Sequence, residues 1–229
     1  TLDPASTFRL TGETLMDPPD DLSLFAVHLA LKAPPRFRVA ALTPEADSAF
    51  RYAIGLESTE EHAALWNELR RGELPTRAGM FVSFPSLHDA SQARPGHHTA
   101  LLWQMVPRTL GGRAWSEVRD DYAAVCIDRL RRHAPNIGES IVGSVAMTPD
   151  DHAAKWPNLA AGLFGRRNTD GEPAGYRTPV AGLYLAGAAM PPGAGLTPAP
   201  AMACLEILAQ DLGAKRWWAR ARRRSGGRR

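Results

Sequence analysis

The residues best suited to hold an anionic or electron-rich ligand form a glycine loop followed by a helix start. Gly187, Gly193 and Gly195 share the loop, and Thr197 then serves as a predicted N-cap with Pro198 at the first helical position. A helix N-terminus presents unpaired backbone N–H groups to such ligands. Because proline has no N–H, the donors expected in the first turn are Thr197, Ala199 and Ala201.

Two apolar segments must position this loop. The run Val180–Ala186 before it predicts a short buried strand. The helix after it ends at Gly213 and carries apolar residues every three or four positions: Met202, Leu205, Leu208 and Leu212. The glycine spacing does not match the dinucleotide fingerprint G-x-G-x-x-G, so an ordinary strand–helix crossover fits the pattern as well.

His88 and Asp89 are a second group of residues with chemical potential. An imidazole and a carboxylate can form a proton-transfer pair, but neighbouring residues of a strand point apart, so this pair requires a turn. His28 lies on one face of a predicted strand and is expected to be structural. The chain shows no metal-ligand spacing, no Ser–His–Asp order and no phosphate loop.

An apolar wall is predicted on the strand Thr99–Val106, where Leu101, Trp103 and Met105 share a face. That face could line the site of an apolar substrate, or it could simply belong to the core. Other predicted strands are 23–31, with Phe25, Val27, Leu29 and Leu31 on one face, 80–84 and 140–147.

Two longer helices and one short helix are expected between these strands. Ser58 and Glu61 form a predicted capping box for the helix 58–71, whose apolar face would contain His62, Leu65, Trp66 and Leu69. The helix 114–133 would face inward through Val118, Tyr122, Val125, Cys126 and Leu130, with Asp120, Asp121, Arg131 and Arg132 in solvent. Thr148 and Pro149 begin the short helix.

Composition is that of an ordinary globular protein. The 229 residues are 44% hydrophobic, and no run approaches the ~20 apolar residues of a membrane span. The first residues lack a signal-peptide pattern. The two cysteines, Cys126 and Cys204, lie in apolar helical sequence and are expected in the core rather than in a disulfide. A cytoplasmic setting is therefore expected.

The formal net charge of the whole chain is +3, and it is not evenly spread. The tail 215–229, which is rich in arginine, carries most of the excess positive charge. A solvated tail is one interpretation, and contact with an anionic surface is the other. Trp217 and Trp218 beside the arginines favour a peripheral membrane contact or a partner groove, and we expect no nucleic-acid binding.

The segment LYLAGA, followed by Pro-Gly-x-Gly and a helix, resembles the closing FAD-binding motif of phytoene-dehydrogenase-like, amine-oxidase-type flavoproteins. Gly187, Pro192, Gly193 and Gly195 match that motif, whereas Met190 and Pro191 replace its usual Thr-His. Ala194, Leu196 and Pro198 also depart from it. The resemblance implies FAD as cofactor, held by Gly187, Ala188, Pro192, Gly193, Gly195, Leu196, Thr197 and Ala199.

Weaker blocks of the same family occur in order along the chain, including LFAVHLALKAPPRF, PSLHDASQARPGHH and TPDDHAAKW. The resemblance implies an α/β (α+β) protein: a mixed-sheet substrate domain with flanking helices, plus the last strand–helix unit of a Rossmann-like FAD domain. Its substrate site would include His88, Leu101, Trp103 and Met105. The expected parts are an irregular leading segment 1–21, the substrate domain 22–175, the closing FAD segment 176–213 and the basic tail 214–229.

The family binds the ADP half of FAD with a G-x-G-x-x-G motif, and the sequence contains none. The strand Val180–Ala186 would also lack neighbours. We therefore predict a subunit of a split FAD-dependent oxidoreductase, completed by a second protein chain, that dehydrogenates a lipophilic or natural-product substrate. No catalytic base is assigned. The alternatives are a fragment of a longer protein, a non-catalytic assembly subunit and a membrane-surface adaptor.

Overall fold

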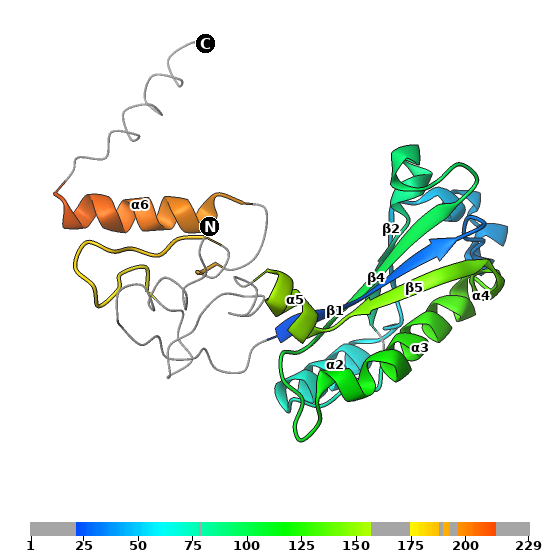
Figure 1. Ribbon diagram of the computed structural model, residues 1–229, viewed down its shortest axis with the longest axis horizontal. Helices are drawn as coiled ribbons and strands as arrows, with labels where there is room; N and C mark the ends of the chain where they lie inside the picture. The colour runs from blue at the N-terminus through cyan, green and yellow to red at the C-terminus, as the bar shows by residue number, and fades with distance from the viewer. Residues whose placement is uncertain (1–21, 78, 157–174, 188–189, 193–196, 214–229) are drawn as a thin grey trace, which may run out of the picture. The chain divides into compact units, whose positions relative to one another are not determined.

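A computed structural model describes residues 22–77, 79–156, 175–187, 190–192 and 197–213 (Figure 1). The chain divides into one compact unit, 22–156, and a second unit that takes in the remaining residues. The first unit ends at Trp156. The domain boundary expected at residue 175 stays a prediction, because residues 157–174 lie outside the described residues. The expected leading segment 1–21 and basic tail 214–229 lie outside the described residues.

The first unit is built on a five-stranded sheet with the strand order β2-β3-β4-β1-β5. The strands are β1 (Leu22–Leu31), β2 (Arg51–Ile54), β3 (Met80–Ser83), β4 (His98–Pro107) and β5 (Ile141–Met147). The α+β class is confirmed. Every pairing is antiparallel, which corrects the expected mixed sheet. The two strands joined through the longest helix, β4 and β5, run in the same direction, but β1 lies between them, so no parallel pair forms.

Five α-helices are described in the two units (Figure 1). They are α2 (Thr59–Arg70), α3 (Trp115–His133), α4 (Ile137–Ser140), α5 (Pro149–Lys155) and, in the second unit, α6 (Ala199–Asp211). Short 3₁₀ helices occupy Arg38–Ala41, Pro44–Ser48, Pro85–Leu87 and Ala90–Gln92.

The predicted helix caps are present at α2 and α5. Ser58 Oγ accepts the backbone N–H of Glu61 at 3.2 Å, and Thr148 Oγ1 accepts that of Asp151 at the same distance. At α5 the Asp151 carboxylate forms the reciprocal hydrogen bond of a capping box, since it accepts the N–H of Thr148 at 2.8 Å. At α2 the Glu61 carboxylate instead accepts the N–H of Glu57, one residue before the N-cap, so only half of the expected capping box forms.

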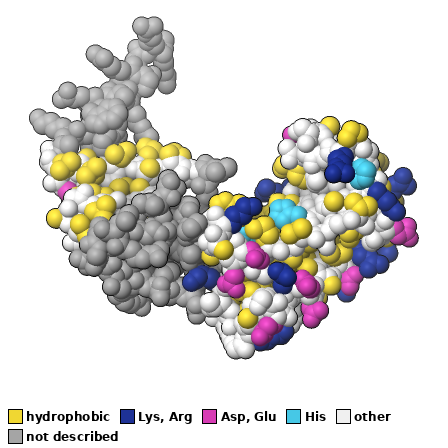
Figure 2. All heavy atoms as spheres, in the orientation of Figure 1, with side chains coloured by type: hydrophobic (Ala, Val, Ile, Leu, Met, Phe, Trp, Pro, Cys, Tyr) yellow, Lys and Arg dark blue, Asp and Glu magenta, His cyan; other side chains and the backbone are white. Residues whose placement is uncertain are grey.

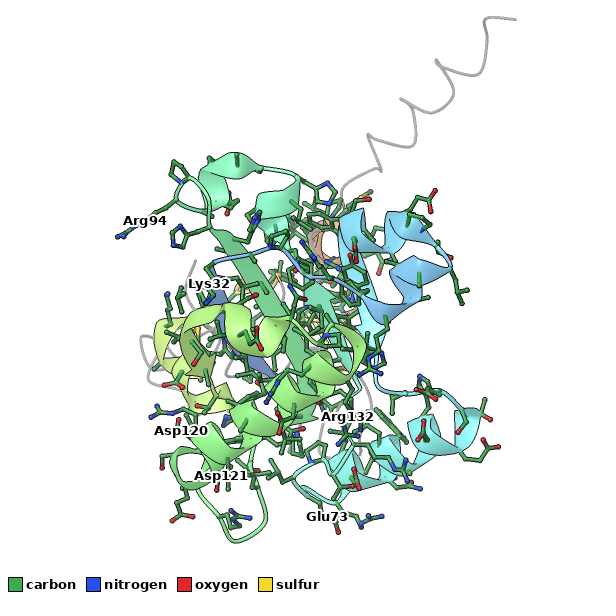
Figure 3. All side chains as sticks on the ribbon, turned by 90° about the vertical axis from the view of Figure 1, so that its right-hand side faces the viewer. Lys32, Glu73, Arg94, Asp120, Asp121 and Arg132 are labelled. Atoms are coloured by element: carbon green, nitrogen blue, oxygen red, sulfur yellow. The ribbon has the colours of Figure 1, made fainter. Side chains whose placement is uncertain are left out.

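The core of the first unit lies between α3 and one face of the sheet. The predicted inward residues of β1 are buried, and so are Val118, Tyr122, Cys126 and Leu130 of α3. Val125 is 45% exposed, which corrects its expected inward position, because the buried residues from Val118 to Leu130 recur every four positions. Asp120 and Asp121 project outward from α3, and Arg131 and Arg132 are exposed in its last turn, as predicted (Figure 3).

The run Val180–Ala186 forms a turn and a single β-bridge instead of the expected buried strand. The N–H of Leu183 donates to the carbonyl of Val180 at 3.1 Å, and Gly182 supplies the positive φ of 78° that this turn requires. Tyr184 then forms an isolated antiparallel bridge with Arg177. Leu185 is the buried residue of the run, since one bridge gives the segment no sheet to enter.

Helix α6 begins one residue later than predicted, with Pro198 as N-cap, and the hydroxyl of Thr197 accepts the N–H of Ala199 at 3.3 Å. The predicted end is confirmed, because Gly213 has a φ of 61°. Three of the apolar residues with the predicted spacing are exposed: Met202, Leu205 and Leu212 are 53%, 50% and 72% exposed. Hydrophobic side chains accordingly gather on the outside of α6 (Figure 2).

Candidate functional site

A pocket of about 310 Å³ lies in the first unit between α2 and the strands β2, β3 and β4. The ladder of β3 with β4 runs only from Phe81–Trp103 to Ser83–Leu101. Beyond the end of this ladder, Met105 of β4 packs against Leu65 and Leu69 of α2. His62 is the one ionisable residue of the lining, which otherwise consists of Ala53, Ile54, Leu56, Leu65, Trp66, Leu69, Gly79, Met80, Phe81, Trp103 and Met105.

Aromatic rings form the walls of this pocket. Phe81 and Trp103 stack with their ring centroids 4.7 Å apart, and Phe81 and Trp66 are 41% and 49% exposed. Single exposed aromatic residues are ordinary on protein surfaces, but several around one hollow indicate a binding surface. Gly79 leaves room for Leu56, because a Cβ added there would lie 2.4 Å from Leu56 Cδ1.

Two of the three predicted wall residues, Trp103 and Met105, line the pocket, whereas Leu101 does not. Leu101 lies on the same face of β4, where it is opposite Ser83 on one side and His28 on the other. The alternation along β4 therefore identified the face, and the position of α2 decides which part of it is hollow.

His62 has a defined hydrogen on one ring nitrogen. Its Nδ1 lies 2.8 Å from the carbonyl oxygen of Ser58, four residues earlier on α2. Because a carbonyl oxygen only accepts, Nδ1 must carry the hydrogen, which leaves Nε2 of the neutral ring as a hydrogen-bond acceptor. Sequence reasoning placed His62 on the apolar face of the helix but gave it no function. The capping pattern at Ser58 was the feature of the sequence that could have indicated the contact between its carbonyl and the His62 ring.

The structure does not bring the predicted proton-transfer pair together. The Asp89 carboxylate accepts hydrogen bonds from Ser91 and Gln92, while the His88 ring packs edge-on against Phe50 at 5.3 Å. The pairing of His88 with Asp89 is thus corrected: a turn does occur, but it directs the carboxylate to the following residues. His88 is exposed and lies outside the pocket lining.

His28 and His152 interact electrostatically, and the sequence did not predict that they lie near each other. His28 is exposed on β1, opposite Leu101 and Val145, and partial burial followed by the charge of Lys155 lowers its pKa. His152 of α5 is buried and stacks on Trp156. Burial also lowers the pKa of His152, although Asp151 opposes this shift. The capping residues Thr148 and Asp151, which fix the start of α5, were the signal for this placement.

The closing segment packs around Met190 in the second unit. Met190 is fully buried with Tyr176, Leu185 and Cys204, and the hydroxyl of Tyr176 donates to the carbonyl of Pro191. Met190, one of the residues that depart from the family motif, therefore serves packing, and the carbonyl of Pro191, another of them, accepts a hydrogen bond. Of the predicted cofactor residues, Gly187, Pro192, Thr197 and Ala199 are described, while Ala188, Gly193, Gly195 and Leu196 lie outside the described residues.

An ion pair joins the bridge of the second unit to the end of α6. The guanidinium of Arg177 donates to both carboxylate oxygens of Asp211, at 2.8 and 2.7 Å, and the Tyr184 hydroxyl donates to the same carboxylate at 2.7 Å. The hydrogen bonds from Arg177 and then from Tyr184 lower the pKa of Asp211 to about 2.

We expect the second unit to lose stability between about pH 4 and pH 2. The pKa of Asp211 lies below its ordinary value of 3.8, so its contribution is present above that value and is lost as the pH falls toward 2. Tyrosine fluorescence and circular dichroism over an acid titration would measure this loss. Asp211→Asn should weaken the unit at neutral pH and flatten its acid transition, and an unchanged transition would contradict the assignment.

Among the residues that the structure describes, the other ionisable groups do not form a metal or thiolate site. The described part of the chain contains no cluster of three or more His, Cys, Asp or Glu residues that could hold a metal ion. The predicted burial of Cys126 and Cys204 is confirmed, and burial raises the pKa of Cys126 to about 12, so it remains a thiol. Among the described helices, none combines the length and the hydropathy that crossing a membrane would need.

Comparison with known proteins relates the chain to oxidoreductases. No protein-family model matches it. It is 28% identical over 211 residues to a limonene dehydrogenase subunit of Castellaniella defragrans, covering 86% of this chain and 38% of that protein. It is 27% identical over 202 residues to pyridine nucleotide-disulfide oxidoreductase domain-containing protein 2 of Mus musculus and of Rattus norvegicus, covering 81% of this chain and 35% of those proteins. The chain thus spans little more than a third of these relatives.

Proposed function

We propose that this chain supplies the substrate-binding unit and the closing flavin-contact segment of an FAD-dependent oxidoreductase that dehydrogenates a lipophilic substrate. The apolar pocket beside α2 carries the proposal, because it provides a place for such a substrate. Similarity to the limonene dehydrogenase subunit supports a dehydrogenase in particular. The resemblance of the segment around Gly187 to a flavin-binding motif supports FAD.

The described residues of the closing segment fit a flavin. Gly187 has a φ of 117° with open space where a side chain would lie, so a planar ring system could approach its backbone. The N-terminus of α6, near Thr197 and Ala199, would stabilise negative charge on the reduced flavin. Bound FAD would supply the hydride acceptor for the substrate carbon, and the chain's own part would be to hold the substrate in the pocket.

A second protein chain would carry the dinucleotide-binding motif and cover the outer face of α6. This face, formed by Met202, Leu205 and Leu212, is apolar and exposed in the described structure. Apolar helix faces are normally buried, and obligate interfaces are large and apolar. The Castellaniella defragrans protein is named as one subunit of its enzyme, which is in keeping with an assembly of several chains.

Co-expression with the product of the neighbouring reading frame, followed by size exclusion with absorbance read at the flavin bands, tests the proposal. A yellow complex that contains both chains is the expected result. A colourless complex would favour a non-catalytic assembly subunit, which the packing role of Met190 makes the second candidate. A monodisperse colourless single chain would contradict both.

Leu205→Asp should abolish co-elution with the partner chain while leaving the circular dichroism of the free chain unchanged. Leu205 is 50% exposed, so the new charge stays solvated in the free chain but would be desolvated in an apolar interface. Gln210→Asp is the matched control, because it adds the same charge at another exposed position of α6. Equal co-elution of both variants would exclude this face from the interface.

A further inference from the structure

The pocket beside α2 has a size that restricts what it can hold. Its volume of about 310 Å³ lies at the lower end of the ~300–1,000 Å³ found for small-molecule sites. A molecule with one or two small rings fits such a space, whereas most of an extended polyene would remain outside it. Trp66, Phe81 and Trp103 give the walls flat apolar surfaces, which suit the faces of a saturated or unsaturated ring.

His62 gives this apolar pocket one polar group, a hydrogen-bond acceptor. The N–H at Nδ1 donates to the carbonyl of Ser58 at 2.8 Å, and His62 is part of the pocket lining, so Nε2 is the ring nitrogen that remains for a ligand. Nε2 of the neutral ring accepts a hydrogen bond and cannot donate one. A ligand with a hydroxyl can satisfy this acceptor, whereas a ketone of the same shape cannot. Sites built to pair with a hydroxyl discriminate against analogues that lack it.

We propose that the pocket binds a compact lipophilic molecule with a single hydroxyl group, which donates to Nε2 of His62. The inference rests on the proposed function in one respect: it assigns this molecule as the substrate class of the oxidoreductase. The binding itself requires only residues of the first unit, on β2, α2, β3 and β4, and it needs no flavin.

Titration of the whole chain, without added flavin, with menthol and with menthone tests the proposal. The two compounds share one ring skeleton, but menthol donates a hydrogen bond and menthone only accepts. Trp66 and Trp103 line the pocket, so tryptophan fluorescence reports occupancy, and Trp66→Phe identifies the signal from the pocket. We expect menthol to bind about 3- to 10-fold more tightly than menthone, as one uncharged hydrogen bond would give.

Two histidine variants separate the proposed hydrogen bond from general effects. His62→Phe keeps an aromatic ring in the pocket lining but removes the acceptor, so the ratio of the two affinities should fall to about one while menthone binding is unchanged. His97→Phe is the matched control. His97 is also exposed, with Nδ1 near the Pro95 carbonyl at 3.3 Å, but it lies outside the pocket lining. It should retain the preference for menthol.

Three outcomes would overturn the inference: no saturable fluorescence change with either compound, equal affinities in the unaltered chain, or a preference for menthol that survives His62→Phe. These outcomes are separate from the flavin test. A yellow complex whose pocket does not bind menthol would support the proposed function and exclude this substrate class. A chain that prefers menthol but never acquires flavin would support the proposed binding site and contradict the proposed function.

Discussion

Replacing Phe25 with alanine should lower the free energy of unfolding of the first unit, 22–156, by about 3 to 5 kcal/mol. Phe25 is 1% exposed on β1, and its ring packs between Trp115 at 5.7 Å and Tyr122 at 5.0 Å, both on α3. The substitution removes apolar burial and leaves a cavity that the aromatic neighbours cannot fill without moving. The packing of α3 against the sheet therefore depends on this ring.

Phe50→Ala is the matched control, because the same atoms are removed from a ring that is 53% exposed. Its effect should stay below about 1 kcal/mol, since surface substitutions cost little. Urea denaturation followed by far-ultraviolet circular dichroism would measure both variants. Similar midpoints for the two would mean that the core does not lie between α3 and β1.

Met190→Ala should destabilise the second unit by about 2 to 5 kcal/mol. Met190 is fully buried, and it contacts the small cluster formed by Tyr176, Leu185 and Cys204. This cluster connects the bridge segment to α6, and it contains few other buried side chains among the described residues. The loss of Met190 would therefore free the residues on both sides of the glycine loop.

Hydrogen exchange measured on peptides from 176–187 and 199–211 would report this change without interference from the first unit. Exchange should become at least ~10-fold faster, since 1.4 kcal/mol corresponds to a factor of ten. Met202→Ala is the control in the free chain, because Met202 is 53% exposed on the opposite side of α6. Protection that is unchanged by Met190→Ala would show that the closing segment is held by other contacts.

Features that depend on residues near one another in the chain could be predicted from the amino-acid sequence. Alternation identified the buried face of β1, and the spacing of Val118, Tyr122, Cys126 and Leu130 identified that of α3. Ser58, Thr148 and Gly213 marked helix ends, because capping requires only a few neighbouring residues. These features mark individual strands and helices, whereas the α+β class was implied by the family resemblance.

The contacts that each apolar face makes followed only from the folded chain. The periodicity of α6 marks a hydrophobic side, but the cluster around Met190 takes Cys204 and leaves Met202 and Leu205 exposed. Val180–Ala186 has the composition of a strand, yet a strand needs neighbours, and a turn at Gly182 forms in their place.

The pocket also depends on the tertiary structure, because residues from β2, α2, β3 and β4 meet there only through the strand order. Trp103 could be placed on a face from alternation alone. The proximity of His62 to that face could not, since helix periodicity carries no information about which strand the helix lies beside. The face on which a residue lies can thus be predicted from its local pattern, whereas the contacts of that face are set by segments distant in the chain.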